Sequence, residues 1–137
     1  MKVAPYLFFD GTCEDAVKFY ARVLDAKIGM TVYYKDMPGE RKPPAEWLGK
    51  IAHTRFAIGD QSIMASDATP EHYRKPQGYS INLNVDTPDE ADRIYKELSA
   101  DAQVIEMPIG ETFWAHRFGS FVDKFGTSWM INCEKQM

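Results

Sequence analysis

Hydrophobic positions along the chain recur with two periods, which predict helices and strands in a fixed order. Two segments show the spacing of an amphipathic helix, and short β-rich runs surround them. The apolar stripes consist of Ala16, Val17, Tyr20, Val23 and Leu24 in the first half and of Ala91, Ile94, Tyr95 and Leu98 in the second. Strands are predicted just before each stripe, then at 27–34, 51–58 and 62–66, and at 103–107, 112–118 and 128–133.

The residues before each stripe predict where the helices begin. Thr87 is expected to cap the second helix, because Pro88 suits the first helical position and Glu90 the third. Thr12 with Asp15 is a weaker version of the same cap. The pattern therefore predicts a strand, a helix and three further strands in each half.

The two halves form an internal repeat. Segment 6–16 corresponds to segment 81–91 at an offset of 75 throughout, so that Thr12 matches Thr87. We expect module one at about 1–68 and module two at about 78–137, with a linker at 67–77 and a surface loop at 35–50. Because neither half is long enough to be stable alone, the halves should share one sheet system within a single domain, residues 1–137.

Composition and charge narrow the classes of partner. The 137 residues are 45% hydrophobic, which is too apolar for a disordered chain, and no apolar run is long enough for a membrane span. The chain carries 16 basic and 20 acidic residues, so it lacks the basic surface that nucleic-acid binding requires. The start does not resemble a signal peptide, and Cys13 and Cys133 have no CxxC spacing. We therefore expect a cytoplasmic protein that binds neither nucleic acid nor membrane.

Several sequence segments together resemble one known family. They are 5–9 with 16–20, 53–60, 63–67, the string ETFWAHRFG at 111–119, and DKFG at 123–126 with 129–132. These segments resemble the PhnB-like family of the vicinal oxygen chelate superfamily, which includes glyoxalase I, bleomycin-resistance proteins and extradiol dioxygenases. The resemblance implies an α+β fold of two tandem βαβββ modules that form a curled mixed sheet around a cavity. It also implies a homodimer.

The resemblance provides a test for a metal site. Metal-dependent relatives carry one ligand on the first strand of each module and a Glu on the last strand. Those positions fall on Pro5, Ser80 and Met130 in this sequence. None offers a carboxylate, imidazole or thiolate, so we expect no metal and no other cofactor at the usual place.

Strand alternation predicts which side chains line the concave face of the sheet. That face combines apolar residues with a few polar groups, which is typical of a small-molecule pocket, although a cavity filled by its own side chains is the alternative. The predicted ligand-binding residues are His53, Arg55, Met64, Ser80, Asn82, Trp114, Met130 and Asn132.

The segment 111–118 holds the candidates for catalysis. His116 could act as a general base near neutral pH, with Glu111 as its partner, although an odd separation on a strand puts the two on opposite faces. His116 could equally lie at a dimer interface or at the edge of the core. We therefore expect metal-free binding of a small, partly apolar molecule. The alternative is a metal-dependent or acid–base enzyme that uses His53 or His116.

Overall fold

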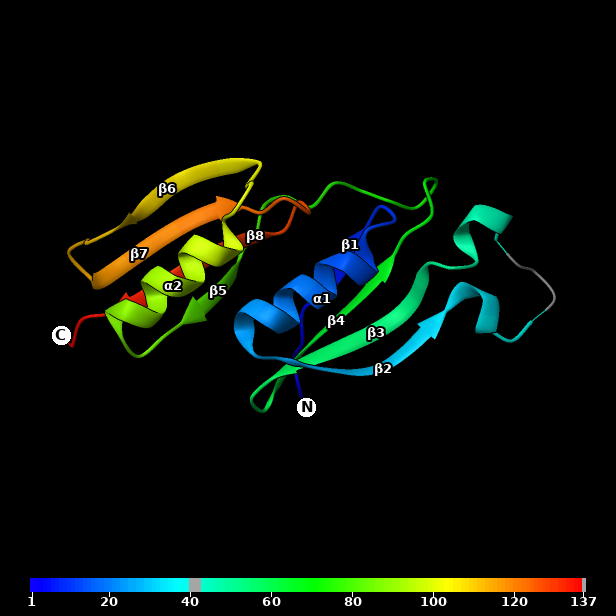
Figure 1. The fold of residues 1–137 in the computed structure, drawn as a ribbon, viewed down its shortest axis with the longest axis horizontal. Coiled ribbons are helices and arrows are strands. Elements are labelled where there is room, and N and C mark those ends of the chain that lie inside the picture. The colour runs from blue at the N-terminus through cyan, green and yellow to red at the C-terminus, as the bar shows by residue number, and fades with distance from the viewer. Residues whose placement is uncertain (40–42, 137) are drawn as a thin grey trace. The chain divides into compact units, whose positions relative to one another are not determined.

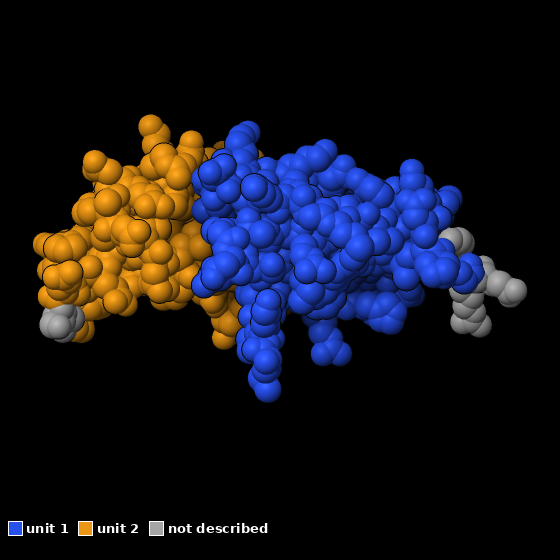
Figure 2. Space-filling view, turned by 90° about the horizontal axis from the view of Figure 1, so that it is seen from below, with its two compact units in different colours: residues 1–74 blue, residues 75–137 orange. Residues whose placement is uncertain are grey.

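The structure, a computed structural model, describes residues 1–39 and 43–136. The chain divides into two compact units, residues 1–74 and 75–137, which Figure 2 shows in separate colours. None of the described helices is long and apolar enough to cross a membrane.

Unit 1 (residues 1–74) contains one helix against one four-stranded sheet (Figure 1). The strand order is β1-β4-β3-β2, in which β1 pairs with β4 in parallel and the other pairs are antiparallel. The predicted loop 35–50 holds two short 3₁₀ helices, and its residues 40–42 lie outside the described residues. The elements are β1 (Tyr6–Phe9), α1 (Cys13–Leu24), β2 (Lys27–Tyr33), η1 (Tyr34–Asp36), η2 (Ala45–Trp47), β3 (Ile51–Ile58) and β4 (Gln61–Asp67).

Unit 2 (residues 75–137) repeats this topology with the strand order β5-β8-β7-β6. Its elements are β5 (Ile81–Asn84), α2 (Pro88–Leu98), β6 (Val104–Gly110), β7 (Ala115–Val122) and β8 (Ser128–Glu134). The α+β fold of two tandem βαβββ modules is confirmed, and each module builds its own four-stranded mixed sheet.

One predicted strand begins in the wrong place. The sequence pattern predicts a strand at 112–118, whereas β7 begins at Ala115 and continues to Val122. The reason is a local turn. The Thr112 N–H donates to the Ala115 carbonyl oxygen at 3.0 Å, and the Ala115 N–H donates to the Thr112 side-chain oxygen at 3.0 Å. Residues 112–114 therefore precede β7, although the Lys135 N–H still donates to the Trp114 carbonyl oxygen at 2.9 Å.

The core of each unit is built around the same aromatic pair. A tyrosine of the helix packs on a phenylalanine of the third strand in its module. The ring centroids lie 6.0 Å apart for Tyr20 and Phe56 in unit 1, and 5.6 Å apart for Tyr95 and Phe121 in unit 2. The apolar stripes of both helices therefore belong to the core, as expected of amphipathic helices.

The two helices begin differently, and only one cap is as predicted. The Thr87 side chain accepts a hydrogen bond from the Glu90 backbone N–H at 3.2 Å, which confirms the cap of α2. The predicted Thr12 cap is wrong, because that side chain makes no capping bond. Instead, Asp67 at the end of β4 accepts from the Cys13 N–H at 2.9 Å and from the Ile51 N–H at 3.1 Å. A tertiary contact thus replaces the local cap.

A second buried carboxylate shapes the turn before β8. Asp123 accepts bonds from the backbone N–H groups of Phe125 at 2.8 Å and Thr127 at 3.0 Å. Its other oxygen accepts from the Trp129 indole at 2.8 Å. The DKFG motif at 123–126 therefore fixes both the turn and a core tryptophan.

The predicted offset of 75 residues between the two halves holds for the helices, but it shifts by one residue for the first strands, β1 and β5. At an offset of 75, Phe9 would match Asn84, yet Phe9 is 2% exposed and Asn84 is exposed. In the sheets, Tyr6 pairs with Met64 and Asn82 pairs with Met130. The strand offset is therefore 76, because a one-residue slip would turn core positions outward.

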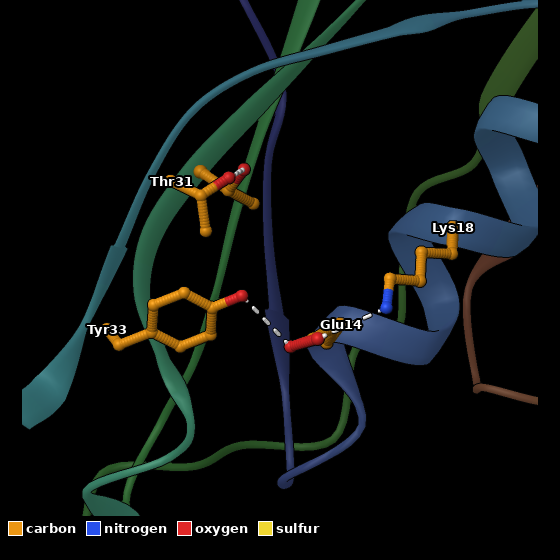
Figure 3. A network of polar contacts seen from close by, with 5 residues as sticks. Glu14, Lys18, Thr31 and Tyr33 are labelled. Atoms are coloured by element: carbon orange, nitrogen blue, oxygen red, sulfur yellow. Dashed lines mark hydrogen bonds and ion pairs between the residues drawn. The ribbon is translucent and has the colours of Figure 1, made fainter.

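Polar contacts attach the outer strand β2 to its own unit. Tyr33 donates to Glu14 Oε2 at 3.2 Å, while Lys18 pairs with the other carboxylate oxygen of Glu14 at 3.2 Å; both contacts can be followed in Figure 3. The hydroxyls of Thr31 and Thr54 are 2.8 Å apart. These contacts link β2 to α1 and to β3.

Candidate functional site

Each sheet has one face under its helix and one face turned away from it. We call the second face the open face of that unit. The predicted binding residues are divided between the two open faces. His53, Arg55 and Met64 belong to unit 1, whereas Ser80, Asn82, Trp114, Met130 and Asn132 belong to unit 2.

The open face of unit 2 carries a continuous chain of hydrogen-bonded side chains. The Trp114 indole Nε1 donates to Asn132 Oδ1 at 3.2 Å. Asn132 Nδ2 donates to Asn84 Oδ1 at 3.1 Å and to Glu134 Oε1 at 3.2 Å. Asn82 Nδ2 donates to the same Asn84 oxygen at 2.9 Å. We call these five side chains the amide network.

The elements explain why these side chains meet. Asn82 and Asn84 are two residues apart on β5, so both side chains point to one face. The register of β5 with β8 sets Asn84 opposite Asn132, and Asn132 lies opposite Phe118 of β7. Trp114 reaches the network from the segment just before β7.

Apolar side chains border the amide network. Met130 pairs with Asn82 across the β5–β8 ladder. The ring centroids of Trp114 and Phe118 are 5.2 Å apart, and those of Phe113 and Trp114 are 5.0 Å apart. Phe113 is 81% exposed. The open face of unit 2 thus combines oriented amides with exposed aromatic surface, which is the composition typical of small-molecule sites.

The open face of unit 1 has a different chemistry. Tyr6 Oη and His53 Nδ1 are 3.1 Å apart, and the Tyr6 and Phe8 ring centroids are 4.8 Å apart. Phe8 is 50% exposed. Arg55 and Met64 are register partners between β3 and β4, so the structure brings both next to Tyr6, the β1 partner of Met64. This face is aromatic rather than rich in amides.

The two candidates for catalysis are not brought together as a pair. Glu111 forms an ion pair with Lys135 at 3.2 Å. His116 is exposed at an irregularity between Ala115 and Arg117, where the β7–β8 register shifts. In the part of the chain that the structure describes, no hydrogen bond or ion pair engages the His116 ring.

The donor set does not fit the metal site of the superfamily. Pro5 has no side-chain donor, and Met130 offers only a weak thioether acceptor. Ser80 Oγ lies 2.6 Å from Ser128 Oγ, and a hydroxyl pair is a poor substitute for an imidazole or carboxylate. Among residues 1–39 and 43–136, no group of three His, Cys, Asp or Glu side chains could hold an ion. We therefore derive no chemistry through a metal here.

Three residues of the open faces are not among the predicted binding residues. Asn84 accepts two bonds at the centre of the amide network, and its alternation with Asn82 already placed it on the same face. Tyr6 contacts His53, and the alternation of buried Leu7 and Phe9 could have indicated it. Glu134 follows Asn132 by two residues on β8, so the same alternation places it on this face.

Comparison with known families identifies the group. The family model described as 3-demethylubiquinone-9 3-methyltransferase matches residues 1–132. The chain belongs to this PhnB-like family. Protein YjdN of Escherichia coli (strain K12) is 38% identical over 144 residues, covering 99% of this chain and 97% of YjdN. Protein PA1353 from Pseudomonas aeruginosa is 39% identical with a TM-score of 0.89, covering 99% of both chains.

More distant structures confirm the superfamily fold. A Bacillus cereus protein described as a PhnB protein and a putative 3-demethylubiquinone-9 3-methyltransferase is 25% identical, with a TM-score of 0.80, covering 97% of this chain and 99% of its own. A glyoxylase/bleomycin resistance protein/dioxygenase domain from Frankia sp. EAN1pec has a TM-score of 0.65 at 13% identity, covering 98% of both chains. At that identity the likeness shows the fold alone.

Proposed function

We propose that this PhnB-like protein binds a small, partly apolar molecule on the open face of unit 2, without a metal. The observation that carries the proposal is the amide network, whose side chains have fixed orientations beside exposed aromatic rings. A few oriented polar groups within an apolar surface are what small-molecule recognition requires. Trp114, Met130 and Asn82 form the contact surface, and Asn132 holds the amides in place.

Ligand capture tests this function. The purified protein is equilibrated with a metabolite extract, separated by filtration and denatured, and the released molecules are measured by mass spectrometry. We expect a small molecule to be enriched by the wild-type protein and lost from the Asn84→Ala variant. The control is Gln61→Ala, which removes an exposed amide at the start of β4 in unit 1. Equal capture by all three proteins would contradict the proposal.

Metal analysis tests the second half of the proposal. Protein purified without chelator is expected to contain no stoichiometric divalent ion, because Pro5, Ser80 and Met130 supply no suitable ligand set. A stoichiometric ion that stabilises the protein against heating would favour the metal-dependent alternative. The Glu134→Gln variant shows whether such an ion uses the one carboxylate of the amide network.

We also propose that the protein acts as a cytoplasmic homodimer. The edge strands support this, because Met30 on β2 is 59% exposed and Val104 on β6 is 51% exposed. Natural sheets usually cover or protect such edges. Cys13 and Cys133 are free and buried, which suits a reducing compartment. Light scattering at micromolar concentration should give about twice the 15.7 kDa mass of the chain. A stable monomer would contradict the dimer.

An acid–base enzyme is the second candidate, and the Tyr6–His53 contact favours it. The bond from Tyr6 to Nδ1 orients the His53 ring and leaves Nε2 to exchange a proton; the tyrosine hydroxyl can donate or accept, so it is compatible with either tautomer. His116 lacks such a partner among the described residues. If the protein converts a molecule on the open face of unit 1, the His53→Gln variant should abolish that conversion and leave capture by the amide network of unit 2 unchanged. Conversion that survives this variant and stops with His116→Gln would transfer the role to His116.

A further inference from the structure

The bonding partners at the two ends of the amide network fix the orientation of every amide in it. The Trp114 indole can only donate, so the Asn132 atom that faces it must be the oxygen. The Asn132 nitrogen therefore faces Asn84 and Glu134, and an ionised Glu134 can only accept. Asn84 must then present its oxygen to Asn132, and Asn82 meets that oxygen with its nitrogen.

This orientation leaves a specific set of hydrogen-bonding atoms free for a ligand. The two Asn132 Nδ2 hydrogens and both acceptor positions of Asn84 Oδ1 are used within the network. Among the described residues, none accepts from Asn84 Nδ2 or from the second hydrogen of Asn82 Nδ2, and none donates to Asn82 Oδ1. The donor Asn84 Nδ2 and the acceptor Asn82 Oδ1 are therefore both free. Because the two amides are bonded to each other at 2.9 Å, this free donor and free acceptor lie within reach of one small molecule.

The charges around the network disfavour an anion. The charged side chain bonded into the network is Glu134, a carboxylate. The neighbouring cation, Lys135, is paired with Glu111 at 3.2 Å. Arg117 of β7 is paired with Asp92 of α2 at 2.7 Å, on the helix side of the sheet. A phosphonate, phosphate or carboxylate would therefore approach a negative group without an unpaired cation beside it.

We infer that the ligand of this face is a neutral molecule that carries a secondary amide or lactam on an aromatic body. A lactam presents a donor and an acceptor on adjacent atoms, which complements Asn82 Oδ1 and Asn84 Nδ2. The aromatic body packs on the exposed Phe113 ring and on the half-buried Trp114 ring beside it. This inference rests on the proposed binding function and specifies its ligand class.

Three probes of similar size test the ligand class. They are 2-quinolinone, which is a neutral aromatic lactam; 1-methyl-2-quinolinone, which lacks the donor; and 1-naphthoate, which is an anion. Each is titrated into the ¹⁵N-labelled full-length protein, and the side-chain amide signals of Asn82 and Asn84 and the indole signal of Trp114 are followed. We expect 2-quinolinone to bind about tenfold more tightly than either comparison probe, since one lost hydrogen bond corresponds to about that factor.

A matched pair of variants assigns the selectivity to the network. Asn84→Asp replaces the free donor with an acceptor of the same size, and it should weaken 2-quinolinone by about tenfold. Gln61→Glu makes the same chemical change in unit 1 and should have no effect. Equal or tighter binding of 1-naphthoate, or an unchanged affinity in Asn84→Asp, would overturn the inferred class while binding itself stands. If no probe perturbs the three signals, the inferred ligand class fails, and ligand capture by the wild-type protein and the Asn84→Ala variant decides separately whether the proposed function stands.

Discussion

The two units have the same backbone topology, and each has the same kind of aromatic pair in its own core, but their open faces differ. Met64 and Met130 occupy the same position in the two sheets. Around Met64 lie Tyr6 and Phe8, whereas around Met130 lie Asn82 and Asn84 at the matching positions. The repeat is therefore retained where side chains pack under a helix and has changed where they do not.

This difference has a physical cause. Buried positions must keep their volume and polarity, because cavities and unpaired polar groups are costly. The Tyr20–Phe56 pair of unit 1 and the Tyr95–Phe121 pair of unit 2 illustrate this constraint. Open-face positions are free of it and can specialise. The comparison teaches that function in this protein is to be sought on the open faces.

The largest expected effect comes from the buried carboxylate of unit 2. Asp123→Ala removes three hydrogen bonds and leaves buried donors unpaired, so the free energy of unfolding should fall by about 3–5 kcal/mol. Urea unfolding measures the loss, and hydrogen exchange should locate it in unit 2. Asp60→Ala, an exposed acid in the β3–β4 hairpin, is the control. A loss spread equally over both units would contradict a role local to unit 2.

A smaller loss of stability is expected at Gly119 of β7, which lies against the Tyr95 ring of α2. A Cβ added at Gly119 would lie 3.0 Å from the Tyr95 ring and 3.3 Å from the Ile109 backbone. Gly119→Ala should therefore destabilise the fold by about 1–3 kcal/mol, as overpacking does. Gly49→Ala meets nothing within 4 Å and should be neutral. Thermal unfolding of both variants tests this; equal melting temperatures would disprove the close packing.

A third prediction compares the two open faces directly. Trp114→Phe keeps a ring but removes the donor that orients Asn132, so the free energy of unfolding should fall by about 1 kcal/mol. Tyr6→Phe removes the corresponding polar contact of unit 1, to His53. Because His53 is half-buried whereas Asn132 is only 6% exposed, the partner left behind in unit 1 regains water more easily, and its loss should cost less than the Trp114 substitution. Urea denaturation ranks the two, and the reverse ranking would show that unit 1 holds the more important network.

The smallest effect concerns pH and the tertiary cap of α1. Burial raises the pKa of Asp67 above its ordinary value of 3.8, although the N–H donors of Cys13 and Ile51 oppose the shift. The folded protein therefore binds this proton more tightly than the unfolded chain does. The free energy of unfolding should decrease as pH rises from 3.8 through the raised pKa, and then level off.

The Asp67→Asn variant isolates that contribution. Its amide does not titrate, so the difference in unfolding free energy between wild type and variant should shrink as pH rises through the same range. Because Asn has one acceptor oxygen for two N–H donors, the variant should remain less stable than wild type above the raised pKa, where both oxygens of the ionised Asp67 accept. A difference that does not change with pH would show that Asp67 has the same pKa in both states.

Local sequence patterns predicted most of the fold and part of the candidate site. Alternation assigned Asn82, Met130 and Asn132 to one face, and these side chains do lie on the open face of unit 2. It could not predict the bond from Trp114 to Asn132, because the turn at Thr112 delays the start of β7. Alternation also set Glu111 and His116 on opposite faces, and the carboxylate of Glu111 pairs with Lys135.

The sequence by itself determined the order of helices and strands in the two modules, the cap at Thr87 and the turn at 123–126, because each of these features depends on residues that are close together in the chain. Only the tertiary structure decided the cap of α1 and the one-residue shift between the first strands. Asp67 reaches Cys13 across 54 residues, and Asn132 reaches Asn84 across 48. Such contacts depend on sheet register and helix docking, which no local pattern of residues encodes.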